Sequence, residues 1–158
     1  MRSNVIAASR RIFTEGDEFL VDIPQDLWFK SVPPFANHVA WHIGHLAVTL
    51  NFGLKVLGLE LVVPMEWGDL YGKGSMPDND GDAQPTTTEL FKTMNKAHEC
   101  LIAGYAQVDD ATLSAENVVE RLRDRYPTNG DFAAFLLTSH AGLHFGQIAM
   151  LRKMLAEG

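Results

Sequence analysis

The sequence has only one cysteine, Cys100, and it has neither a secretory leader nor a membrane-spanning segment that can be recognised. One cysteine cannot form an internal disulfide, which is compatible with a reducing compartment. The first twenty residues, MRSNVIAASRRIFTEGDEFL, contain no continuous apolar stretch of the kind found in signal peptides. The most apolar region, residues 39–65, is interrupted by histidine, asparagine, lysine and glutamate, so it falls short of the ~18 apolar residues of a membrane span. We therefore expect a cytoplasmic protein with no membrane partner.

Basic residues are also scarce. The 13 lysines and arginines are outnumbered by 20 acidic residues, which gives a net charge of −7. Proteins that bind nucleic acid or anionic membranes need a basic surface, so both classes of partner are disfavoured. With 158 residues, of which 46% are hydrophobic, the chain is long enough to bury a core. We expect a single domain over residues 1–158 that acts on a small-molecule substrate.

Strand-like alternation is absent beyond a few residues, whereas helical periodicity is extensive. It predicts four long helices, at about residues 4–21, 36–57, 86–107 and from 128 or 129 almost to the C-terminus. A capping-box pattern, Thr86-x-x-Glu89, marks the start of the third helix. The connection at residues 59–85 is long enough that it either has a function or contains a short helix. These features predict an all-α fold, a four-helix bundle with long crossover loops.

Two histidines, His140 and His144, lie on the buried face of the last predicted helix, in SHAGLHFGQIAMLRK. The buried stripe follows steps of three and four through Ala133, Leu137, His140, His144, Ile148, Leu151 and Leu155. Side chains at positions i and i+4 lie about 5–6 Å apart at Cβ, close enough to bind one divalent metal together. The alternative is a pair of core histidines that hydrogen-bond to their surroundings, because an unsatisfied buried imidazole costs roughly 1–3 kcal/mol.

A third ligand would have to come from another helix, and the second helix offers three histidines in ANHVAWHIGHL. His38, His42 and His45 follow one side of that helix, at i, i+4 and i+7. Periodicity does not choose among them, although His42 lies nearer than His45 to the main apolar stripe. The helix is apolar almost all round, which predicts contacts with more than one neighbour. One of those neighbours is expected to be a second subunit, so we expect a homodimer.

Two other kinds of metal site fit the sequence poorly. The spacing of HAGLH matches the HExxH motif of metalloproteases, but Ala141 stands where the catalytic glutamate belongs. Asp78, Asp80 and Asp82 follow the spacing of a calcium loop, but Ala83 replaces the glycine that makes its sharp turn. We interpret that stretch as a solvated acidic loop.

The two histidine segments resemble those of the DinB/YfiT-like superfamily of metal-binding four-helix bundles. The last helix matches in its HxxxH pair followed by Gly-Gln, and the second helix matches in Trp41, Gly44 and His45. The resemblance extends over essentially the whole chain. It implies a metal site formed by His45, His140 and His144, and so favours His45 over His42. It leaves His38 and His42 without an assigned role.

The resemblance also implies a class of chemistry. Characterised members include S-transferases that use low-molecular-weight thiols such as bacillithiol, and a mycothiol-dependent isomerase. A zinc or nickel ion held by three imidazoles keeps a coordination position open, as catalytic zinc sites do. We therefore expect a metal-dependent enzyme, with a thiol S-transferase as the first candidate. A small-molecule hydrolase and a non-enzymatic metal-binding bundle are the alternatives.

Several further residues have two interpretations in the sequence. Trp41 either walls the metal pocket or packs in the core. Trp67 and Tyr71, in the long connection, are candidates to cap the pocket. Gln147 is either a hydrogen-bonding partner in the site or a surface residue. No aspartate or glutamate is placed beside the histidines by spacing, so the sequence names no general base.

Overall fold

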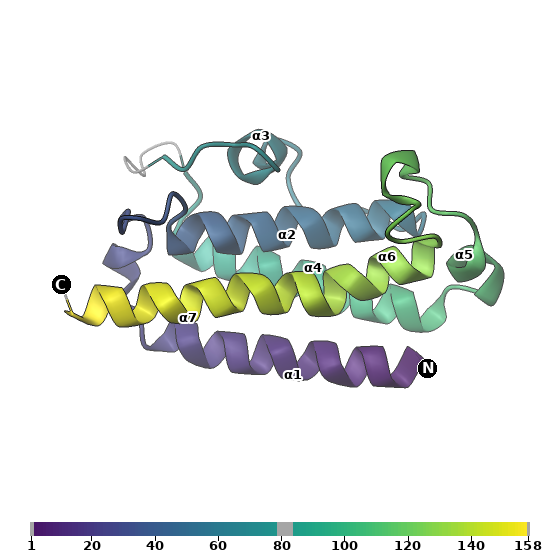
Figure 1. Cartoon of the computed structure of the whole chain (residues 1–158), viewed down its shortest axis with the longest axis horizontal. Helices are drawn as coiled ribbons and strands as arrows, with labels where there is room; N and C mark the ends of the chain where they lie inside the picture. The colour runs from purple at the N-terminus through teal and green to yellow at the C-terminus, as the bar shows by residue number, and fades with distance from the viewer. Residues whose placement is uncertain (1, 79–83, 158) are drawn as a thin grey trace.

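The computed structural model describes residues 2–78 and 84–157, and these form a bundle of helices (Figure 1). Within the described ranges the long helices are α1 (Arg2–Val21), α2 (Val39–Val56), α4 (Thr87–Gln107) and the consecutive segments α6 (Asn129–Phe135), η3 (Leu136–His140) and α7 (Ala141–Glu157). Short helical segments lie between them: η1 (Gln25–Leu27), α3 (Trp67–Tyr71), α5 (Asp110–Ser114) and η2 (Glu120–Leu122). The predicted all-α bundle with long crossovers is confirmed.

The four long helices do not simply alternate in direction. Figure 1 shows α1 and the α6–α7 helix running one way, and α2 and α4 running the other. α2 packs along α4, and α1 packs along α7. Because α2 and α4 are parallel, the chain between them must travel back along the bundle, which explains the length of that connection. This return segment carries the short helix α3, as its length suggested.

The helix starts are set by side-chain caps. Thr86 and Glu89 form the predicted capping box of α4, and Thr128 and Asp131 form a second one at α6. α2 begins at Val39 rather than near residue 36, because the ring of His38 caps it: His38 Nδ1 accepts a 3.0 Å hydrogen bond from the Trp41 main-chain N–H. His38 therefore has a structural role at the start of this helix.

The apolar surface of α2 is covered within the chain itself. Residues 39–47 are all buried. Trp67 and Tyr71 of α3, which are 5% and 1% exposed, pack over the side of α2 that the bundle leaves open. The all-round apolar pattern that suggested a second subunit is thus accounted for by α3 and its flanking segments. Dimerisation stays a prediction without support from this helix.

The last long helix contains a π-helical turn, η3, which ends at His140. A π turn inserts one extra residue into an α-helix and often occurs at functional sites. It changes the direction of the side chains before it relative to those after it. The buried stripe nevertheless continues on both sides, with Ala133, Leu137, Ile148 and Leu151 at most 1% exposed.

Two sequence expectations concern other parts of the chain. None of the described helices has the length and apolar character needed to cross a membrane. In the acidic stretch, Asp80 and Asp82 lie outside the described residues. Asp78 is exposed, and its main-chain carbonyl oxygen lies 3.0 Å from His38 Nε2.

Candidate metal centre

Three histidines from the second and the last helices gather at one point in the bundle. His45 of α2, His140 of η3 and His144 of α7 each offer a ring nitrogen, and these three nitrogens lie within 4.8 Å of one another. The ring centroids are 5.3 Å apart for His45 and His140, 4.8 Å for His45 and His144, and 4.6 Å for the last pair. The sequence prediction that these three residues converge therefore agrees with the geometry.

The orientation of His45 is fixed by two neighbours. Its Nδ1 donates a 2.7 Å hydrogen bond to the main-chain carbonyl oxygen of Tyr71. A carbonyl only accepts, so Nδ1 carries the proton in the neutral ring and Nε2 is left free to bind a cation. The ring of Trp41 stacks on the imidazole at 4.7 Å with an interplanar angle of 11°. Trp41 therefore packs against a candidate ligand rather than lining the pocket.

His144 has a histidine partner that the sequence did not assign. The Nδ1 atoms of His42 and His144 lie 2.9 Å apart and form a hydrogen bond. With Nδ1 engaged, Nε2 is the nitrogen of His144 that remains for a metal. His42 thus contacts a candidate ligand instead of being one. Its position one turn before His45 could have suggested this, but the spacing fitted direct ligation equally well.

His140 supplies the observation that tests whether a metal fits. Its Nδ1 is buried and has no hydrogen-bond partner among the described residues. Leaving a buried polar nitrogen unsatisfied costs about 1–3 kcal/mol, so such atoms normally have a partner. A cation bound by this cluster, or a molecule bound to that cation, would give the unpartnered imidazole of His140 an interaction partner. The residues present therefore fit a metal.

The electrostatics favour neutral, metal-binding imidazoles. Burial lowers the pKa of His140 to about 4 and that of His144 to about 2, and the neighbouring imidazoles add to both shifts. Burial also lowers the pKa of His45, against the opposing effect of its hydrogen bond to Tyr71. Because a metal ligates the unprotonated ring, a depressed pKa removes proton competition at neutral pH.

The spacing of the nitrogens suits one ion after a small contraction. Ligands 2.0–2.1 Å from a tetrahedral zinc are about 3.4 Å from one another. The observed limit of 4.8 Å exceeds this by an amount that small side-chain rotations can close.

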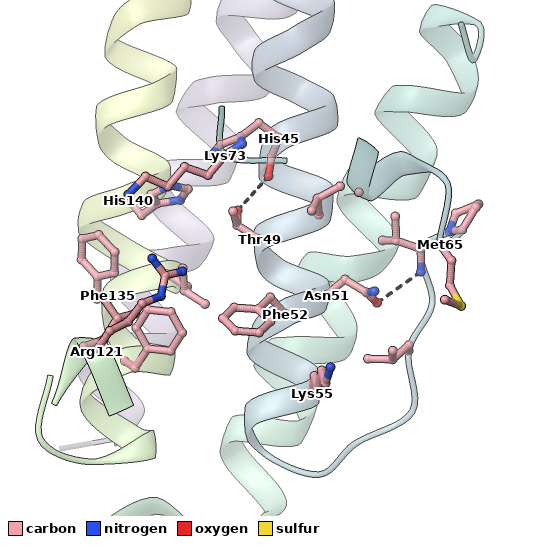
Figure 2. A pocket seen from close by; sticks show the side chains of 18 residues that line it. His45, Thr49, Asn51, Phe52, Lys55, Met65, Lys73, Arg121, Phe135 and His140 are labelled. Carbon is pink, nitrogen blue, oxygen red and sulfur yellow. Dashed lines mark hydrogen bonds between the residues drawn. The ribbon is translucent and has the colours of Figure 1, made fainter. Parts of the chain in front are cut away.

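A pocket of about 500 Å³ opens beside the histidine cluster (Figure 2). His45 and His140 line one end of it, where Figure 2 shows them facing each other from neighbouring helices. Most of the remaining wall is apolar and includes Phe52, Leu61, Val63, Leu122, Phe132, Phe135 and Leu136. A molecule in this pocket would therefore reach the cluster along a largely hydrophobic wall.

Two connections complete the walls of the pocket. The α2–α4 connection is held to α2 by Asn51, whose side-chain oxygen accepts hydrogen bonds from the main chain of Val62 and Val63. The α5–α6 connection is held by two buried asparagines. Asn117 donates to the Tyr126 carbonyl oxygen, and Asn129 accepts from the Val118 main chain. The sequence did not reveal these asparagines as anchors of a pocket.

The other sequence candidates lie elsewhere. Trp67 and Tyr71 are buried against α2 and do not line the pocket, although Gly68 between them does. Gln147 is exposed on α7, in agreement with its surface interpretation. Cys100 is partly buried and packs against the core.

Together the fold and the site define a helical bundle with a three-histidine cluster at the end of an apolar pocket. The family model of the DinB superfamily matches residues 14–148. The chain therefore belongs to the DinB superfamily, as its sequence motifs indicated. A comparison with curated proteins gives no match.

Proposed function

We propose that this protein is a metal-dependent enzyme that acts on a small molecule. In this proposal His45, His140 and His144 hold a divalent ion, zinc or nickel. The observation that carries the proposal is the position of the cluster at the end of the 500 Å³ pocket, with His45 and His140 among its lining residues. Three protein ligands leave a coordination position open, as in catalytic rather than structural zinc sites.

The reaction we propose is the transfer of a low-molecular-weight thiol to an electrophilic small molecule. The bound metal would supply Lewis acidity, lowering the pKa of a thiol or water beside it. The protein residues position the ligands: Tyr71 fixes the ring of His45, and His42 fixes that of His144. The phenylalanine walls exclude water and bind the apolar part of the substrate.

Metal content gives the first test. Protein purified without a polyhistidine tag is expected to take up about one zinc or nickel ion per chain, and His144→Ala is expected to lose it. His38→Asn is the matched control. This variant removes an imidazole that lies at the start of α2, outside the three-histidine cluster, and asparagine can still cap the helix. Equal metal content in His144→Ala and wild type would contradict the proposed ligand set.

Activity gives the second test. Metal-loaded protein is assayed with bacillithiol, mycothiol and other small thiols against 1-chloro-2,4-dinitrobenzene, which releases chloride as the carbon–sulfur bond forms. We expect turnover that requires metal, survives in His38→Asn and disappears in His144→Ala. Metal binding without turnover of any thiol would overturn the transferase assignment. Metal-dependent hydrolysis of a small ester or amide would then make the protein a hydrolase.

A further inference from the structure

The pocket beside the cluster has an unusual charge. Three cationic side chains line it, from three different segments: Lys55 of α2, Lys73 after α3, and Arg121 of η2. No aspartate or glutamate of the described residues lines it. In a chain with 20 acidic and 13 basic residues, an all-cationic pocket is opposite in sign to the molecule as a whole.

Among the described residues, these three cations have no ion-pair partner. Within residues 2–78 and 84–157, no carboxylate lies within ion-pair distance of Lys55, Lys73 or Arg121. Their side chains are exposed at the pocket walls. They are therefore available to an anionic ligand, and the guanidinium of Arg121 has the planar donor geometry that suits a carboxylate, sulfonate or phosphate.

The cations are also distributed along the length of the pocket. Lys73 lies at the end where His45 and His140 lie, Lys55 lies at the other end, and Arg121 lies across the pocket from Lys55, beside Phe135 (Figure 2). Along α2, Lys55 follows His45 by ten residues, which corresponds to about 15 Å of helix. Between the two ends stand the aromatic rings of Phe52 and Phe135 (Figure 2), and Phe132 also lines the pocket.

We infer that the pocket binds amphipathic anions: small molecules with an aromatic or branched apolar body whose acidic group is attracted by the cations of the pocket wall, among them Lys55 and Arg121 on its two sides. The inference deepens the proposed function, since it assigns the substrate class of the same site and depends on that site being the place of reaction.

Binding of matched dyes tests the inference without any turnover. 8-Anilinonaphthalene-1-sulfonate and N-phenyl-1-naphthylamine share an aromatic body, but only the first has a negative charge. Fluorescence titrations use the wild-type protein and the double variant Lys55→Gln/Arg121→Gln. The control Lys92→Gln/Lys153→Gln makes the same change in net charge outside this pocket, and Lys92 lines the second cavity of the molecule.

We expect the double variant to bind the sulfonate dye about 5–30-fold more weakly, from the loss of two partly screened charge contacts. Its affinity for the neutral dye should stay within twofold of wild type, and the control should match wild type for both dyes. Added salt should weaken only the binding of the sulfonate dye. Equal losses for both dyes, an unchanged sulfonate affinity, or a loss in the control instead would each overturn the inference.

The titrations are made on both metal-free and zinc-loaded protein, which separates this inference from the proposed function. Charge-selective binding without zinc uptake would support the anion-binding pocket and contradict the metal site. Zinc uptake without charge-selective dye binding would support the metal site and contradict the anion-binding pocket.

Discussion

The aromatic ring of Tyr71 packs directly against Gly44 of α2. A methyl group on this glycine would stand 2.3 Å from the ring, closer than any real contact. The absence of a side chain at Gly44 therefore lets Tyr71 lie close enough for its carbonyl oxygen to hold Nδ1 of His45. The Trp41, Gly44 and His45 motif is thus a positioning unit, in which the tryptophan sets the ring plane and the glycine admits the hydrogen-bond acceptor.

Gly44→Ala should consequently damage both stability and metal binding. The added methyl overpacks the α2–α3 contact, so we expect a loss of about 1–3 kcal/mol in the free energy of unfolding. Displacing the Tyr71 carbonyl should weaken zinc binding about tenfold or more. Urea denaturation and isothermal titration measure the two effects.

Gly146→Ala is the control for this substitution. Gly146 lies in α7, and a Cβ built on it meets nothing within 4 Å. Alanine in a helix is about 0.5–1 kcal/mol more favourable than glycine, so this variant should be slightly more stable than wild type. A Gly44→Ala protein as stable as Gly146→Ala would show that the Tyr71 contact does not constrain the site.

His42 should act on the metal through His144. Removing the hydrogen-bond partner of a ligating histidine typically lowers metal affinity about 10–100-fold. We expect His42→Ala to show a loss of that size while still binding one ion per chain, as measured by competition with a zinc indicator. Loss of binding as complete as in His144→Ala would instead make His42 a direct ligand, and an unchanged affinity would remove it from the site.

A separate histidine, His98, is expected to make the stability of the protein depend on pH. It is 3% exposed, its ring stacks on Phe13 at 3.5 Å, and its Nε2 lies 2.8 Å from the hydroxyl oxygen of Ser9. Burial, and secondarily the charge of Arg10, lower the pKa of His98 to about 4. An unfolded histidine has a pKa of about 6.5, so between these values the unfolded chain binds the additional proton.

The stability that His98 contributes is therefore complete above about pH 6.5 and is lost as the pH falls towards 4. We expect the free energy of unfolding of metal-free protein to fall across this range. His98→Gln should reduce the fall by up to roughly 3 kcal/mol, because glutamine does not titrate. Urea denaturation at pH 7, 6, 5 and 4 compares the two proteins, and parallel curves would contradict this assignment.

Much of this architecture could be predicted from the sequence because it depends on local patterns. The periodic apolar residues predicted the long helices, and the Thr86–Glu89 capping box predicted where α4 starts. The i, i+4 spacing of His140 and His144 identified the histidine pair. The choice of His45 came from resemblance to the DinB superfamily, because the helical period did not separate it from His42.

What the sequence did not reveal depends on contacts between distant segments. The π turn that ends at His140 has no distinctive residue pattern. The bond between His42 and His144 joins positions 102 residues apart, and the pocket walls come from connections whose paths are set by buried asparagines. Lys55, Lys73 and Arg121 are ordinary surface cations in the sequence, and only the fold brings them around one pocket.

The central claim is that three imidazoles bind one metal ion at the end of this pocket. X-ray absorption spectroscopy of the zinc-loaded, untagged protein tests it most directly. We expect one zinc per chain with three imidazole nitrogens at about 2.0–2.1 Å, and loss of this signal in His45→Ala, His140→Ala and His144→Ala. A zinc ion with fewer than three imidazoles, or a spectrum unchanged by these substitutions, would contradict it.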